Sequence, residues 1–338
     1  MKSTYSLKYY YFSVVLLAGF LSPNFCYSQG GYYGEFSRIG FSPIGLSMGN
    51  AMTASTQFTG HSYYNPAQAA IESSTIPLLL STALMQFDRQ LHMVSANFQL
   101  PPSAGLTFSL INARTGDIDG RNLSGYHTGY LSTSEYRLSG AFGIRFSDSV
   151  LAGVGINFNH SDLHEEVPSV QGIGIDFGII GKISSRLNIG VSVQNLLSSG
   201  SINTSDLYGT ESAPKKEKEP LRVMFGVTSI FFEDLTIHAD YEVRNQYGES
   251  ALDSIGRNEV RSTAHFFRSG VDYSPHERIS LRGGFVWNQK SSEQKLQPSA
   301  GFSVHLPFDQ FNPFIDYAFV EEPSGISSMH IVGLRVNI

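Results

Sequence analysis

The chain has 338 residues, of which 41% are hydrophobic, 12% aromatic and only 15% charged, whereas soluble domains carry roughly 25% charged residues. The many aromatic residues exclude a disordered chain, and 33 glycines without a fixed period exclude a collagen-like one. A formal charge of −6 gives no overall basic surface, so nucleic acid is not an expected partner.

Residues 1–28 have the pattern of a cleaved signal peptide. Lys2 and Lys8 give a positive start, Tyr9–Leu21 is mostly apolar, and Cys26-Tyr27-Ser28 offers small residues at a cleavage site. The apolar run is shorter than the roughly 20 residues of a spanning helix, and a lipid anchor on Cys26 is the weaker alternative. Cleavage removes two lysines, no acidic residue and the only cysteine. The exported chain would therefore carry a charge of −8 and no disulfide.

Residues 29–75 form a segment without regular alternation and almost without charge. From Ile39 to Ile71 no charged residue occurs if His61 is neutral, and Gly, Ser, Thr, Asn and Ala predominate. A solvated linker of this length normally carries charges, and a lipid-spanning segment carries fewer amides and hydroxyls. The segment therefore needs a polar but enclosed environment.

From residue 76 onward, apolar and polar residues alternate with period two, which predicts β-strands with one apolar face. The clearest case is 235–244, where an apolar set alternates with Thr236, His238, Asp240, Glu242 and Arg244. The pattern predicts about fourteen strands, near 76–87, 90–100, 104–113, 134–147, 149–161, 170–183, 186–197, 221–232, 235–247, 262–273, 278–289, 296–306, 311–320 and 328–338. These are longer than the strands of a soluble sandwich and long enough to cross a bilayer when tilted.

An even number of long alternating strands predicts an all-β fold, a transmembrane antiparallel β-barrel spanning residues 76–338. Hydrocarbon leaves no partner for backbone N–H and C=O groups, so the sheet must close on itself, with apolar faces toward lipid. The last strand, ending at Ile338 rather than the usual aromatic residue, would close against the first. Outer-membrane lipid is thus an expected partner and the cell outer membrane the expected location.

The connections between the predicted strands alternate in length. They are tight after even-numbered strands and mostly long after odd-numbered strands, with one short exception at Asp88-Arg89; the long ones are 114–133, 162–169, 198–220, 248–261 and 290–295. Outer-membrane barrels have short periplasmic turns and longer extracellular loops. The start of the first strand and the C-terminus are therefore expected on the periplasmic side.

Residues 29–75 are best interpreted as a plug inside this barrel, because small polar residues can hydrogen-bond to lumen side chains. A loose periplasmic arm is the alternative. A filled lumen disfavours an open diffusion porin.

Several ionisable residues fall on the polar faces of the strands and predict a lumenal charge network: His238, Asp240, Glu242, Arg244, Arg268, Asp272 and Arg282. An acid/base cluster is the competing interpretation, and it is weaker because arginines surround the acids. His160 and His164 beside Glu165-Glu166 resemble a metal-ligand spacing, but that spacing aligns ligands only on a helix. We expect no metal, no cofactor and no enzymatic activity.

The run Gly45–Ala54, followed by Tyr63–Ala67, resembles the N-terminal signature of the PorV/PorQ family of outer-membrane barrels, which are related in fold to FadL-type fatty-acid transporters. The matching residues are Gly45, Met48, Gly49, Ala51, Thr53, Ala54, Tyr64, Asn65, Pro66 and Ala67. The acidic residues usual after this turn are replaced by Ser55-Thr56-Gln57-Phe58, and the usual arginine is absent near Pro43-Ile44. These departures leave the subgroup open.

The resemblance implies two roles. The first is a non-enzymatic accessory or docking component of type IX-like protein export, with secretion subunits or secreted cargo as partners. The alternative is a FadL-type channel for uptake of hydrophobic small molecules, with the N-terminal segment as a hatch.

Overall fold

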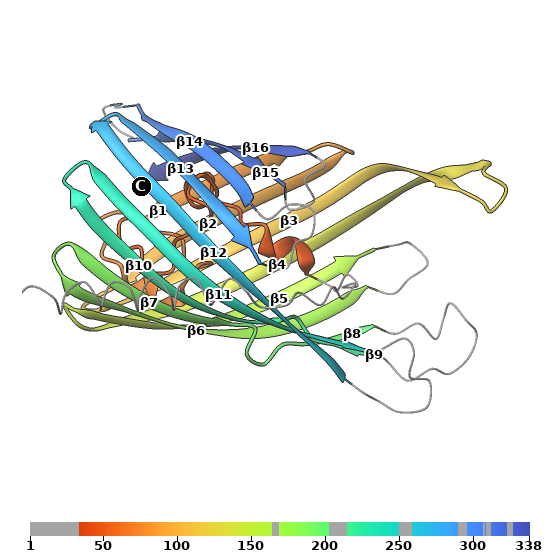
Figure 1. Ribbon diagram of the computed structural model, residues 1–338, viewed down its shortest axis with the longest axis horizontal. Helices are drawn as coiled ribbons and strands as arrows, with labels where there is room; N and C mark the ends of the chain where they lie inside the picture. Colours follow the sequence, from red (N-terminus) through yellow and green to blue (C-terminus); the bar gives the residue numbers. More distant parts are fainter. Residues whose placement is uncertain are drawn as a thin grey trace, which may run out of the picture.

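The computed structural model describes residues 34–163, 169–202, 215–249, 259–289, 296–306, 308, 312–322 and 327–338. The predicted signal peptide lies outside the described residues. One sheet dominates the structure (Figure 1). Its strands are β1 (Pro77–Leu84), β2 (Arg89–Leu100), β3 (Ala104–Arg121), β4 (His127–Ser147), β5 (Val150–Asp162), β6 (Val170–Ser184), β7 (Leu187–Gln194), β8 (Ser199–Ile202), β9 (Lys215–Glu217), β10 (Leu221–Phe232), β11 (Leu235–Glu249), β12 (Glu259–His276), β13 (Ile279–Asn288), β14 (Leu296–His305), β15 (Phe314–Glu321) and β16 (Ser328–Asn337).

The sheet closes into an antiparallel barrel of fourteen strands, which confirms the predicted fold class. Closure comes from pairing between β1 and β16, with Leu78 opposite Val336, and from pairing between β5 and β6. The short strands β8 and β9 are additional, since they form a small hairpin that extends the outer part of β6. A closed barrel leaves no unpaired strand edge in the wall, as hydrocarbon requires.

Side chains alternate between the two faces of the wall. On β4, Leu138 and Phe142 are exposed on the outside whereas Arg137 is buried inside. On β11, Ile237 and Tyr241 point outward, and Glu242 is fully buried. The outer surface is thus apolar and the inner surface is largely polar, as the period-two pattern predicts.

The hairpin of β3 and β4 is longer than predicted. The sequence assigned 114–133 to a loop, but β3 continues to Arg121 and β4 begins at His127. Alternation is hidden there because a bulge between Thr115 and Ile118 shifts the register, and Asp117 takes a positive φ of 47°. The residues 114–133 therefore form a two-stranded ribbon, which Figure 1 shows projecting beyond the rest of the barrel.

Residues Gly34–Thr75 lie mostly inside the barrel (Figure 1). They contain three short helices, η1 (Glu35–Arg38), α2 (Pro43–Ser47) and η2 (Pro66–Ala70). Helices α2 and η2 each have proline at the first turn, where no backbone N–H is needed, and contact β13–β16 and β2–β6 respectively. In the described part of the chain, no helix has the length and apolar character needed to cross a membrane.

Candidate functional site

The inner wall carries one crowded glycine on each of ten strands. A Cβ atom built at any of them would come within 3.0 Å of an atom of residues 43–70, closer than real Cβ contacts allow. We call this set the glycine belt: Gly105, Gly143, Gly153, Gly178, Gly190, Gly226, Gly270, Gly284, Gly301 and Gly333. The segment thus approaches the wall at distances that only glycine permits, around most of the barrel.

Asn65 joins the segment to the wall at the belt. Its side-chain Nδ2 lies 2.8 Å from the Thr53 carbonyl oxygen and 3.3 Å from the carbonyl oxygens of both Ile179 and Val191. Its Oδ1 accepts a hydrogen bond from the Ala67 N–H at 3.0 Å, which caps η2. One fully buried amide therefore ties two turns of the segment to β6 and β7.

The other signature residues predicted from the sequence lie on this contact surface. Met48 and Thr53 face belt glycines, and the N–H and hydroxyl of Thr53 donate to Asp240 Oδ2 at 3.0 and 2.7 Å. Gly45 leaves room for the ring of Tyr64, whose hydroxyl donates to Asn50 Oδ1 at 2.8 Å. The remaining signature residues are buried, and all are small residues or proline: Gly49, Ala51, Ala54, Pro66 and Ala67. Several of them bring their backbone close to the wall.

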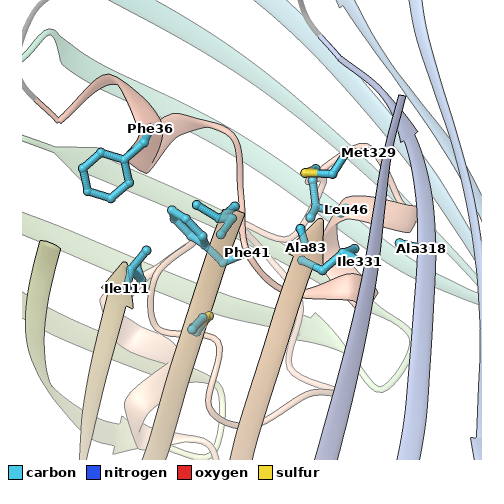
Figure 2. Close-up of a cluster of buried hydrophobic side chains, with 10 residues drawn as sticks. Phe36, Phe41, Leu46, Ala83, Ile111, Ala318, Met329 and Ile331 are labelled. Carbon is cyan, nitrogen blue, oxygen red and sulfur yellow. The ribbon is translucent and has the colours of Figure 1, made fainter. Parts of the chain in front are cut away.

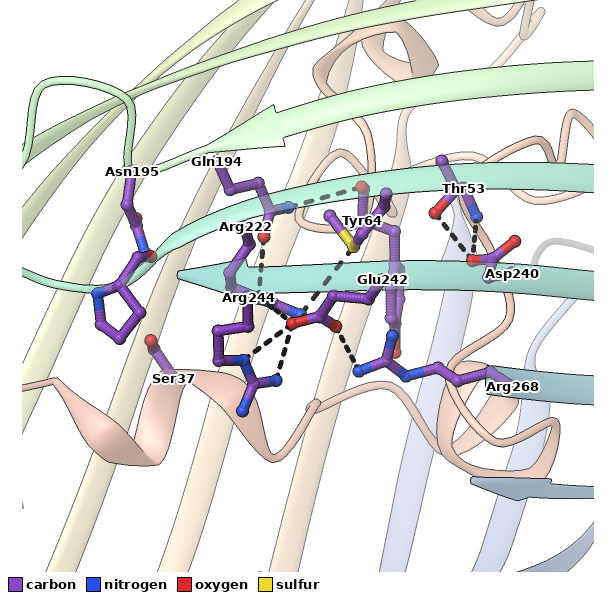
Figure 3. Close-up of polar contacts among 12 residues, drawn as sticks. Ser37, Thr53, Tyr64, Gln194, Asn195, Arg222, Asp240, Glu242, Arg244 and Arg268 are labelled. Atoms are coloured by element: carbon purple, nitrogen blue, oxygen red, sulfur yellow. Dashed lines mark hydrogen bonds and ion pairs between the residues drawn. The ribbon is translucent and has the colours of Figure 1, made fainter. Parts of the chain in front are cut away.

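The predicted charge network divides into separate groups, of which Figure 3 shows the one around Glu242. Glu242 lies at the centre of the first, bridged by the guanidinium groups of Arg222 at 2.9 Å, Arg244 at 2.7 Å and Arg268. All four side chains come from β10, β11 and β12 and are buried. Burial of several charges is tolerated here because each bridges an opposite charge.

A second charged group lies on β12–β16. Arg282 Nε is 3.1 Å from Asp272 Oδ1, and Arg335 Nη2 is 3.3 Å from Asp316 Oδ1. Two predicted network residues are apart from both groups: His238 pairs with the Thr228 hydroxyl at 3.0 Å, and Asp240 binds the segment.

Sequence reasoning missed Arg222 and one more buried ion pair, Arg137 with Glu219 at 3.1 Å. Arg222 and Gly226 are four residues apart on β10, so their side chains lie on the same face of the strand. The alternation along β10 would therefore have placed Arg222 in the lumen. Glu219 was assigned to a charged outer loop, and only the fold shows that it is buried.

The inner wall also has an apolar patch, which sequence reasoning missed (Figure 2). Leu91 and Met93 of β2 and Met329 and Ile331 of β16 face inward and are buried. We define the apolar patch by its wall residues: Ala83, Leu91, Met93, Ile111, Ala318, Met329 and Ile331. At Met93-Val94 and Ile331-Val332 both neighbours are apolar, but the sequence does not say which of the two faces inward.

Residues from the N-terminal segment cover the apolar patch. Phe36, Phe41 and Leu46 complete the cluster, and the rings of Phe36 and Phe41 meet edge to face at 6.4 Å. The patch lies toward the ends of β1 and β16 that are opposite the C-terminus. This is the end at which the long loops were predicted.

A polar cavity of about 20 Å³ lies between the segment and strands β3–β7 and β10. Its lining includes Ser37, Tyr63, Arg137, Asn157 and Asp176. This volume accommodates one or two water molecules. It is too small for an organic solute.

The proposed metal-ligand spacing has no helical context. His160 lies in β5, with Nε2 3.3 Å from Asp162 Oδ2, and His164, Glu165 and Glu166 lie outside the described residues. Within the described ranges, no group of three His, Cys, Asp or Glu side chains is arranged to hold a metal ion.

Neither a family model nor the sequence of a curated protein matches the chain. Solved structures do match. The Pseudomonas putida toluene transporter TodX aligns with a TM-score of 0.58 at 14% identity, over 88% of this chain and 97% of that one. The CymD monoaromatic hydrocarbon channel aligns with a TM-score of 0.61 at 10% identity, over 90% and 98%.

A FadL homologue from Pseudomonas aeruginosa aligns with a TM-score of 0.58 at 10% identity, over 88% of this chain and 98% of that one. The chain has a FadL-like barrel fold. These identities establish the fold alone. The FadL-like part of the resemblance is thereby supported, and the PorV/PorQ assignment stays a prediction.

Proposed function

We propose that this chain is an outer-membrane channel of FadL type for hydrophobic small molecules, and not an enzyme. The observation that carries the proposal is the apolar patch, a hydrophobic surface inside an otherwise polar and charged lumen. Such a surface offers an organic solute a site from which water is excluded. The fold similarity to TodX, a toluene transporter, and to CymD, a monoaromatic hydrocarbon channel, supports the same class of solute.

The solute would bind where Phe36 and Phe41 now lie. Both belong to residues Gly34–Phe41, which we call the strap. The strap crowds none of the belt glycines and is held by single hydrogen bonds. The Gly34 N–H donates to Glu135 at 3.4 Å, and Arg137 donates to the Ser37 hydroxyl at 3.0 Å. Its carbonyl groups accept from the Tyr63 hydroxyl, the Asn50 amide and the Ser81 hydroxyl. A solute that replaces the two rings would gain similar apolar contacts, so displacement of the strap costs little apolar burial.

Residues 43–70, by contrast, are fixed by the glycine belt and by Asn65. We therefore propose that the strap is the moving hatch and that the rest of the predicted plug stays in place. This reduces the proposed hatch from residues 29–75 to a short part of them.

The test is uptake of a hydrocarbon such as toluene by cells that carry Met93→Trp. Met93 faces the apolar patch, so the larger ring would fill the space that the solute needs. The matched control is Val94→Trp, because the adjacent residue faces outward. We expect uptake to fall about tenfold in Met93→Trp, the equivalent of roughly 1.4 kcal/mol of lost binding, and to stay unchanged in Val94→Trp. Equal uptake in the two variants, with both folded, would refute the proposal.

The export role implied by the PorV/PorQ resemblance rests on the signature alone. Within the described ranges, the signature residues are accounted for by packing against the wall, so they need no secretion partner to explain them. Normal surface attachment of exported proteins in a deletion strain would agree with the channel proposal.

A further inference from the structure

The β3–β4 ribbon has an unpaired backbone edge. Pairing of β4 with β5 ends at Ser134 opposite Asp162, yet β4 continues outward to His127. In the part of the chain that the structure describes, no strand pairs with residues 127–133 on that side. Over this stretch, roughly 20 Å long, the N–H and C=O groups of alternate residues therefore point to that side without a sheet partner.

The ribbon lies beyond the apolar band of the barrel. The last fully apolar row on the outer surface comprises Leu80, Val94, Leu110, Leu138, Phe158 and Ile173, each opposite the next. The next row outward is Thr82, His92, Asn112, Tyr136, His160 and Gln171. Ser134 and residues 127–133 of β4 lie farther out than this polar row, so lipid tails do not cover the free edge.

The two faces of the ribbon differ in chemistry. One face pairs Ile118 with Leu131 and Gly120 with Gly129, so it is apolar and flat. Ile118 and Leu131 are 37% and 38% exposed, and a Cβ on Gly129 would meet nothing within 4 Å. A second layer of side chains fits over this face.

The opposite face neutralises its own charges. Asp119 accepts from Arg121 at 2.6 Å and from His127 at 2.6 Å, and the His127 ring lies 5.0 Å from that of Tyr130. The ribbon's other acid, Asp117, is exposed but lies on β3, and residues 127–133 of the β4 edge include no acid, so that edge offers no carboxylate to a charged partner. Its complement is a segment with an uncharged, apolar face.

A second copy of the chain fits this edge poorly. Two barrels inserted in one membrane have the same orientation, so their β4 edges both run in the same direction. They could pair only in parallel, which is the less stable arrangement. A segment that arrives from outside the cell is free to run antiparallel to β4 and to continue the ladder that β5 begins.

From this geometry we propose that β4 residues 127–133 bind an extended, uncharged segment of another protein as an added antiparallel strand. Backbone hydrogen bonds to the free edge supply the attraction, and apolar side chains at alternate positions lie beside Leu131 and extend the apolar face that it forms with Ile118. The strand-addition site does not depend on passage of a solute through the barrel.

The test uses the full-length protein in lipid nanodiscs and a fluorescent peptide of about eight alternating valines and threonines with a lysine at each end. Fluorescence anisotropy should show saturable binding. The double variant Ile118→Lys/Leu131→Lys should weaken binding about tenfold by placing charges on the apolar face. Tyr130→Lys, which changes the opposite face at a neighbouring position, should leave it within about twofold.

Two further measurements complete the test. The same peptide with alternate amides N-methylated cannot form the strand ladder and should not bind. Equal binding of both peptides, or no saturable binding of the first, overturns the proposal. Mass photometry that finds a dimer lost in Leu131→Lys also overturns it, since a second copy would then occupy the edge.

Discussion

Glycine has opposite surroundings in the glycine belt and in the ribbon. At the belt, a Cβ on Gly284 would collide with backbone atoms of Met48 and Gly49. In the ribbon, Gly116 and Gly129 have nothing within 4 Å of an added Cβ. The belt glycines are therefore fixed by what packs against them, whereas Gly116 and Gly129 leave open space beside the ribbon. The comparison separates residues that hold the molecule together from residues that are available to a partner.

The largest expected effect is at the belt, where adjacent glycines of β13 provide a matched pair. Gly284→Ala would push the new methyl group into backbone that cannot move aside, so we expect roughly 3 kcal/mol of destabilisation or failure to assemble. In Gly283→Ala the nearest atom to the new Cβ is 4.0 Å away, and no loss is expected. The heat-modifiable band on a denaturing gel measures the folded fraction. Equal folding of both variants would show that the segment does not press on the wall.

The next effect compares two capping asparagines. Asn65→Ala removes a fully buried amide and takes from the Ala67 N–H and the Thr53 carbonyl the bonds that Asn65 makes to them, which should cost about 2–4 kcal/mol. Asn122→Ala removes two bonds at the ribbon turn, where Oδ1 accepts from Ser124 and Tyr126 N–H groups that water can reach. We expect its cost to stay below about 1 kcal/mol. Urea unfolding in lipid vesicles gives both values, and equal losses would contradict the distinction.

Acid should also affect the two regions differently. His61 is buried, with Nδ1–H donating to the Thr59 carbonyl at 2.9 Å and Nε2 accepting from the Ser42 hydroxyl at 2.7 Å. Burial lowers the pKa of His61 to about 4. The unfolded chain, with the ordinary pKa of 6.5, then binds the proton more readily. Stability is therefore complete above pH 6.5 and falls by up to roughly 3 kcal/mol as the pH drops to 4.

In the ribbon, hydrogen bonds from His127 and then Arg121 lower the pKa of Asp119. A carboxyl group with a lowered pKa keeps its contribution above its unfolded pKa of 3.8 and loses it only below. Between pH 6.5 and 4 the contribution of His61 should be lost while the Asp119 contacts persist. Unfolding curves of the parent and of His61→Gln over this range check the sign, and an unchanged slope in the variant would contradict it.

The sequence predicted the barrel well because each wall strand must show lipid an apolar face. That constraint repeats along every strand, so period-two alternation identified all fourteen, and the tight turns set their order. It failed at 114–133 and 198–220, where chain outside the lipid is free of the constraint. Neither the bulge at Asp117 nor the β8–β9 hairpin leaves an alternating pattern.

The interior was less predictable from sequence. The polar faces of β11 and β12 gave Glu242 and Arg268, but nothing local paired them with Arg222 on β10. The grouping of charges depends on strand register, which brings distant residues together. The apolar patch was missed because an inward apolar residue, such as Met93, is identical in sequence to a lipid-facing one.

The smallest expected effect is at the ribbon tip. Leu123 is fully exposed, and Leu123→Ser should change the free energy of unfolding of the barrel by less than about 0.5 kcal/mol, because a side chain that touches nothing loses no packing. Gly116→Ala should be equally silent. Both variants are measured beside Gly284→Ala in the same vesicles. A loss above about 1 kcal/mol in either variant would mean that the ribbon packs against the barrel, and a ribbon packed in that way could not keep a free edge for an added strand.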